Sequence, residues 1–190
     1  MQLRRLLLLS FASALLSYLG IRIEAVGLPE ALAFIFFEYS PGVFFGALVL
    51  ASRVSEDSGV WWRRIRLVIV SALIWYIALQ VAVGSWPRQL VGIVSCSSAG
   101  LLGALMICIA CRFIIPQRFS LMQIMMALLA GVVGGASIGI FSEDWLPSWV
   151  GPLGSVGGFF IWQMGVAFAL FSGYFLGSEV SSEPTQEPRS

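Results

Sequence analysis

Long apolar runs alternate with short polar segments along almost the whole chain. Each run is close to the roughly 20 residues that an α-helix needs to cross a hydrocarbon layer of roughly 30 Å. The pattern predicts an all-α integral membrane protein, a bundle of six transmembrane helices within residues 1–177, and a disordered cytoplasmic tail at 178–190. The expected spans are residues 3–21, 30–52, 67–84, 89–111, 119–141 and 153–177.

The first run has a basic start, as a secretory signal peptide does. No small-x-small cleavage site follows Gly20, and a second apolar run comes almost at once. We therefore interpret residues 3–21 as a retained first span.

The second run contains one acid, Glu38, and one helix-breaking residue, Pro41. A carboxyl group near the centre of a membrane helix costs about 2.5–3.5 kcal/mol on insertion scales, so we expect Glu38 to be uncharged or paired and to face the bundle interior. Pro41 lacks an N–H and disfavours helical geometry at Ser40, so we expect a kink or break with a hinge at Ser40, Pro41 and Gly42. A broken span, with Ser40 capping a second half-helix, and a simple proline kink both fit the sequence.

Composition supports the membrane interpretation and excludes several functions. The chain is 58% hydrophobic and 11% charged, with a mean hydropathy of +0.91, far from an ordinary soluble domain. A net charge of +1 without a long basic cluster gives no reason to expect a nucleic-acid partner. The chain has no His, which excludes His-based catalysis and metal sites, and we expect no cofactor, no metal and no enzymatic activity.

Arginine placement predicts the orientation. Nine of the eleven Arg lie in the N-terminus, the segments 53–66 and 112–118, and the tail, whereas Arg22 and Arg88 fall in the opposite loops. Because cytoplasmic loops of membrane proteins carry an excess of basic residues, both termini are expected in the cytoplasm. The absence of Lys and Asn gives a further hint of a bacterial inner (plasma) membrane protein.

Four polar residues fall at similar depths in three spans that run in the same direction. They are Glu38, the pair Ser95 and Ser98, which share one helical face, and Gln163. A carboxyl group, two hydroxyls and an amide in one layer would suit a proton relay or the pathway of a small polar solute. The same groups could equally serve as ordinary hydrogen bonds between helices.

Small residues recur at four-residue spacing in the last two spans, at Gly131, Gly135, Gly139 and at Gly165, Ala169, Gly173. Such faces allow helices to approach closely. We expect them to pack against each other within one chain, although a homo-oligomer or a membrane partner could also use them.

Two short motifs carry less weight. Cys108 and Cys111 have C-x-x-C spacing. A metal or redox role would need further ligands or a nearby activating charge, and only Arg112 is at hand, so we expect buried structural cysteines. Residues 135–139 match the letters G-x-S-x-G, but that hydrolase motif needs a strand-to-helix turn and a His, so it is rejected.

These patterns leave more than one function open. The leading hypothesis is a small transporter or permease-like protein in the lipid bilayer, with Glu38 in or beside the pathway of a proton or small solute. The alternative is a non-catalytic membrane subunit or scaffold that assembles through its Gly-rich faces. A third class, an enzyme acting on lipid, would have Glu38 as an acid and no evident base.

Overall fold

A computed structural model describes residues 2–21, 29, 38–54, 59–84, 91–115, 119–141 and 150–171. About 95% of these residues are helical and none of them is in a strand, so the all-α prediction is confirmed for this part of the chain. The elements are α1 (Gln2–Ile21), a helical segment 38–44 that continues as a π-helix (Phe45–Leu50) and a 3₁₀ turn (Ala51–Arg53), α3 (Val60–Gly84), a π-turn (Val91–Ser95), α4 (Cys96–Ile114), α5 (Leu121–Phe141) and α6 (Val150–Phe171).

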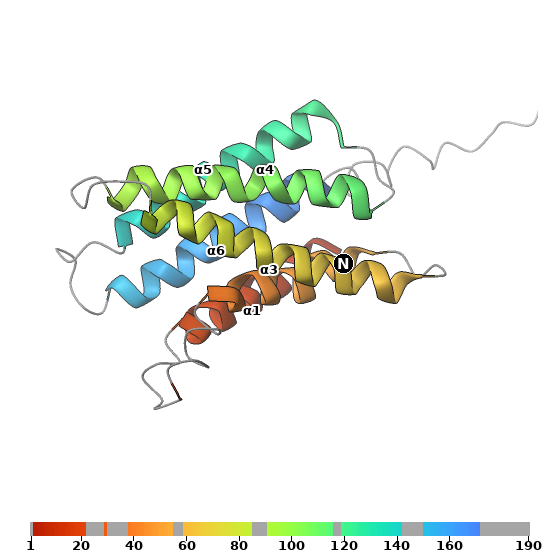
Figure 1. Cartoon of the computed structure of the whole chain (residues 1–190), viewed down its shortest axis with the longest axis horizontal. Coiled ribbons are helices and arrows are strands. Elements are labelled where there is room, and N and C mark those ends of the chain that lie inside the picture. Colours follow the sequence, from red (N-terminus) through yellow and green to blue (C-terminus); the bar gives the residue numbers. More distant parts are fainter. Residues whose placement is uncertain are drawn as a thin grey trace, which may run out of the picture.

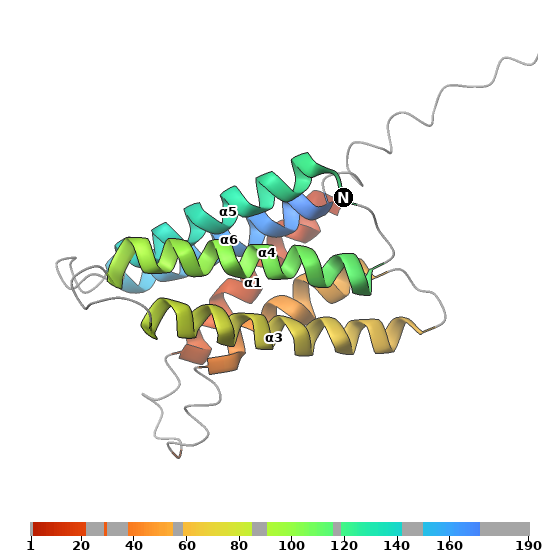
Figure 2. The same ribbon diagram turned by 45° about the horizontal axis from the view of Figure 1, so that its top comes forward.

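Successive helices lie side by side and run in alternating directions (Figures 1 and 2). Helix α1 packs on α6, α6 on α5, α5 on α4 and α4 on α3. The segment 38–54 packs on both α3 and α1, which closes the described helices into a ring. Residues distant in sequence, at the two ends of the described chain, are therefore direct neighbours.

Three of the described helices are long and apolar enough to cross a membrane, over Val60–Ala82, Gly92–Ile114 and Leu121–Ile140. A shorter apolar helix covers Val156–Phe171. Large apolar side chains are also exposed on the outside of the bundle. Water-soluble monomers rarely expose large contiguous apolar areas, whereas lipid solvates them. These features are compatible with a membrane protein. The exposed residues include Leu8, Phe11, Leu19, Ile69, Leu73, Leu101, Ile109, Phe113, Leu121, Met122 and Leu129.

Some helix boundaries differ from those expected. Helix α3 begins at Val60 instead of residue 67, so the exposed Trp61 and Trp62 belong to its first turn. A hydropathy pattern locates only the apolar part of a helix. Arg and Trp are compatible with helical geometry, so the helix extends beyond the apolar part into residues 60–66. Helix α6 begins at Val150 and reaches Phe171. Residues 172–177 and the predicted tail lie outside the described residues.

The helix is continuous through Ser40, Pro41 and Gly42, so the described residues 38–44 contain no break. In an α-helix, a residue other than proline at position 41 would donate its backbone N–H to the carbonyl of residue 37. Residue 37 lies outside the described residues, so Pro41 removes no hydrogen bond within 38–54. The backbone departs from α geometry at Phe45, four residues after Pro41. From there it forms a π-helix, at whose end Ala51 donates its N–H to the carbonyl of Gly46. A hinge at residues 40–42 stays a prediction.

Glycines let α4 and α5 meet backbone to backbone. A Cβ added at Gly131 would lie 2.5 Å from the carbonyl oxygen of Gly100, and one at Gly139 would lie 2.7 Å from that of Gly92. A Cβ at Gly135 would meet the carbonyl of Cys96. The glycine face of the fifth span is therefore filled by α4 and the π-turn before it, in the same chain, and the expectation that it packs on the sixth span is wrong.

Helix α6 packs on a different face of α5. A Cβ at Gly134 would meet the backbone of Trp162, and one at Gly165 would lie 2.7 Å from the Cβ of Ala130. Ala169 is also buried, whereas Gly173 lies outside the described residues. The two helices are also joined at their ends, since the side-chain amide of Gln123 donates to the carbonyl of Leu170 at 3.1 Å.

We predict that Gly131→Ala destabilises the protein by about 1–3 kcal/mol, because the new methyl group would overlap the Gly100 carbonyl. Thermal unfolding of the purified protein in detergent, followed by circular dichroism, measures the change. Gly157→Ala is the matched control, since no atom of another described helix lies within 4 Å of its added Cβ and alanine favours helix. An equal midpoint for the two variants would contradict the close approach of α4 and α5.

Candidate functional site

Glu38 is buried in the bundle and is 6% exposed. Its carboxylate Oε2 accepts a hydrogen bond of 3.2 Å from the side-chain Nε2 of Gln80 on α3. The described residues thus give this buried acid an uncharged partner. Both protonation states can keep the bond, because a proton on Oε1 leaves Oε2 free to accept from the amide.

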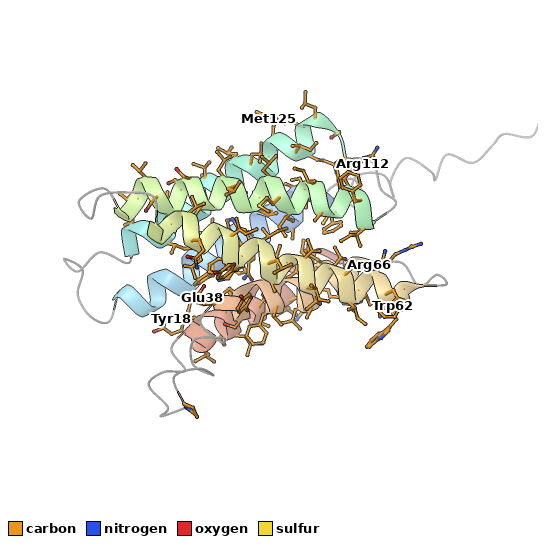
Figure 3. The ribbon with its side chains drawn as sticks, viewed as in Figure 1. Tyr18, Glu38, Trp62, Arg66, Arg112 and Met125 are labelled. Atoms are coloured by element: carbon orange, nitrogen blue, oxygen red, sulfur yellow. The ribbon has the colours of Figure 1, made fainter. Side chains whose placement is uncertain are left out.

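The acid lies toward one end of the bundle, not halfway along it. Its partner Gln80 is exposed on the outside of the bundle and is two residues from Ala82, where the apolar stretch of α3 ends. Figure 3 shows Glu38 and Tyr18 near one end and Arg66 and Arg112 near the other. Glu38 is therefore buried by packing within the protein, toward one end of the bundle.

Aromatic stacking fixes the segment 38–44 beside α3 at this position. The rings of Tyr39 and Tyr76 are 5.3 Å apart with an interplanar angle of 12°. Tyr76 and Gln80 are four residues apart and therefore lie on one face of α3, opposite the consecutive residues Glu38 and Tyr39. The stack and the hydrogen bond hold the same two elements together.

A second polar group lies in the seam between α1 and α6. Gln163, with 0% of its surface exposed, donates from Nε2 to the hydroxyl of Ser17 at 3.2 Å. The Ser17 hydroxyl donates in turn to the carbonyl of Ser13 at 2.7 Å. Gln163 is eight residues from Phe171, the last described residue of α6, and lies well inside the helix.

The structure does not join the four polar residues expected to share a layer. Ser95 donates to the carbonyl of Gly92 at 3.4 Å, and Ser98 donates to that of Val94 at 2.8 Å, both within their own helical turns. The hydrogen bonds of Glu38 and Gln163 lead to Gln80 and Ser17, on two other helices. Sequence depth alone could not predict which way these side chains point around each helix.

Trp162 occupies the centre of the bundle, one residue before Gln163. Its indole N–H donates to the carbonyl of Gly100 on α4 at 3.3 Å. Its ring lies 5.3 Å from that of Phe45 and 6.2 Å from that of Trp75, between centroids. Helices α3, α4 and α6 and the segment 38–54 therefore share one aromatic core.

Two buried polar atoms near this core lack partners among the residues that the structure describes. They are the hydroxyl oxygen of Ser40 and the indole Nε1 of Trp75. Ser40 lies two residues from Glu38, and Trp75 lies on the helix that carries Gln80. Buried polar atoms of this kind are ordinarily satisfied by ordered water or a ligand.

Cys108 and Cys111 lie near the end of α4 that carries Arg112, away from Glu38. Cys108 and Cys111 are buried in α4 and form no disulfide. Cys108 lines a surface groove of about 370 Å³ together with Arg112 and Phe119, among others. No three Cys, Asp or Glu side chains that could hold a metal come together in the described parts of the chain.

Comparison of the chain with protein-family models, curated proteins and solved structures finds no match. The site must therefore be interpreted from its own geometry.

Three features of the site were missed in the sequence. Gln80 is the one side-chain amide in the apolar run 67–84. An isolated amide of this kind is a possible hydrogen-bond donor for an acid in a neighbouring span, and it is the donor to Glu38. Ser10, Ser13 and Ser17 recur at three- and four-residue spacing, which marks one helical face. Trp162 had no sequence signal, because an aromatic residue in an apolar span can equally face lipid.

We predict that Trp162→Ala lowers the free energy of unfolding by about 3–5 kcal/mol, because it empties the aromatic core and leaves the Gly100 carbonyl without its donor. Thermal denaturation in detergent tests this. Trp61→Ala is the matched control, since Trp61 is 68% exposed and should change stability little. Comparable losses in both variants would contradict the central position of Trp162.

Proposed function

We propose that the chain is a small six-span membrane protein of a bacterial inner membrane, with both termini in the cytoplasm. In this proposal it is a transporter without enzymatic activity that moves a proton or a small polar solute. Glu38 is the group that takes up and releases the proton at one end of the pathway. The single observation that carries the proposal is a buried acid held by an uncharged amide.

The arrangement of charges supports the proposed topology. Every arginine in the described residues belongs to a helix terminus at the same end of the bundle: the start of α1, the end of segment 38–54, the start of α3 or the end of α4 (Figures 1 and 3). Basic residues gathered at one end are typical of the cytoplasmic face. Glu38 then lies toward the outer face.

The pairing of Glu38 with Gln80 supports a proton-exchanging role. A carboxylate fixed by Arg would be held in its charged form, whereas an amide donor can serve the charged and the neutral acid alike. Gln80 is exposed and its partner is almost fully buried, so the pair connects the bundle surface with its interior. Acids inside membrane proteins commonly mark such proton pathways.

The alternative of a scaffold that assembles through its glycine faces receives less support. The carbonyls of α4 and of the π-turn before it already fill the face formed by Gly131, Gly135 and Gly139. A partner would displace α4 to reach these positions.

We predict that Glu38→Gln abolishes proton movement while preserving the fold, because the new amide oxygen can still accept from Gln80 and can no longer exchange a proton. Purified protein in liposomes that contain a pH-sensitive dye is exposed to a pH step under an imposed membrane potential. Wild-type protein should collapse the pH gradient faster than empty liposomes, and the variant should match the empty liposomes.

Glu143→Gln is the matched control, because it removes an acid from a segment outside the predicted spans. It should behave as wild type. If Glu38→Gln collapses the gradient at the wild-type rate, Glu38 has no coupling role.

The proposed orientation predicts a cytoplasmic C-terminus. Green fluorescent protein fused after residue 190 should fluoresce in bacterial cells, and alkaline phosphatase fused at the same position should be inactive. The reverse pattern would contradict the orientation, since each reporter is active on only one side of the inner membrane.

A further inference from the structure

The buried face of α1 carries three hydroxyls in one stripe. Ser10, Ser13 and Ser17 each have 0% of their surface exposed, and their spacing of three and four residues places them on one side of the helix. This helix packs on α6, where Gln163 is equally buried. The seam between α1 and α6 is therefore polar along about two helical turns.

The hydrogen bonds of the seam determine which way the Gln163 amide points. The Ser17 hydroxyl has one proton, which it donates to the carbonyl of Ser13 at 2.7 Å. It can therefore only accept from Gln163, at 3.2 Å, so the group facing it is Nε2. The amide oxygen Oε1 points elsewhere, is buried, and has no partner among the described residues.

Two further hydroxyls on the same face of α1 as Ser17 also lack a hydrogen-bond partner among the described residues. The hydroxyl oxygens of Ser10 and Ser13 are buried and have no hydrogen-bond partner in the described part of the chain. Buried polar groups are almost always hydrogen-bonded, and ordered water is the usual partner when protein atoms are not. Two hydroxyls and an amide oxygen supply the two to four partners that a buried water needs.

We propose that the α1–α6 seam is a binding site for water, in which one or more ordered molecules bridge Oε1 of Gln163 to the hydroxyls of Ser13 and Ser10. A water molecule donates to the amide oxygen and to one hydroxyl and accepts from the other hydroxyl, which satisfies all three atoms. The complete burial of Gln163 and the three serines favours water over a larger solute. This site goes beyond the proposed function, because it does not involve Glu38.

Water-edited solid-state NMR tests the proposal on the full chain, deuterated and back-exchanged in H₂O, in deuterated lipid bilayers. Magnetisation from water protons should reach the Gln163 side-chain amide within a short mixing time. The exposed guanidinium of Arg66, at the arginine-bearing end of the bundle, is the positive control. The indole N–H of Trp162, which is bonded to Gly100, is the negative control. Gln163→Leu and Trp162→Phe assign the signals.

The double variant Ser10→Ala, Ser13→Ala should reduce the transfer to Gln163 to the level of the Trp162 indole, because water loses two of its three partners while Ser17 keeps its bond. A wild-type Gln163 signal no stronger than that of Trp162 would show a dry seam and overturn the proposal. A strong signal that the double variant leaves unchanged would also overturn it, since the serines would not hold the water. If the double variant does not fold, the wild-type measurement decides alone.

Discussion

The contact between the backbones of α4 and α5 constrains the rest of the bundle. Glycines on both helices leave no side chain between them, so Gly100 and Gly131 face each other directly. Lipid tails offer little hydrophobic driving force between membrane helices, and close backbone packing is then a main source of association. Trp162 completes this arrangement, since its backbone fits against Gly134 on α5 and its indole bonds to Gly100 on α4.

The aromatic core around Trp162 separates the polar groups into two places. On one side Gln80 and the tyrosine stack hold Glu38 beside α3. On the other side Gln163, adjacent to Trp162 on α6, faces the serines of α1. A hydrogen bond is stronger in a low-dielectric interior, and an unpaired polar group there costs more free energy. Each polar cluster therefore favours one relative placement of the two elements that it joins. The two clusters are joined by no hydrogen bond between described residues, which is why their proposed roles are independent.

Positive charge gathers at one end of the bundle and the buried acid lies toward the other (Figure 3). Alternating helix directions produce this separation, because the ends of α1, α3 and α4 that carry arginine fall on the same side (Figure 1). The carboxyl group of Glu38 thus avoids the arginines and relies on an amide. A group bound in this way can change its charge without losing its partner.

The sequence alone determined the helical class, because long apolar runs can satisfy their backbone in lipid only as helices or closed barrels, and it indicated that Glu38 would be sheltered. It also identified the glycine positions at 131, 135 and 139. Only the tertiary structure decided that these glycines meet α4, that Glu38 pairs with Gln80, and that Gln163 pairs with Ser17. Spacing along one helix defines which residues share a face, but the neighbour of that face depends on how every other helix packs around it.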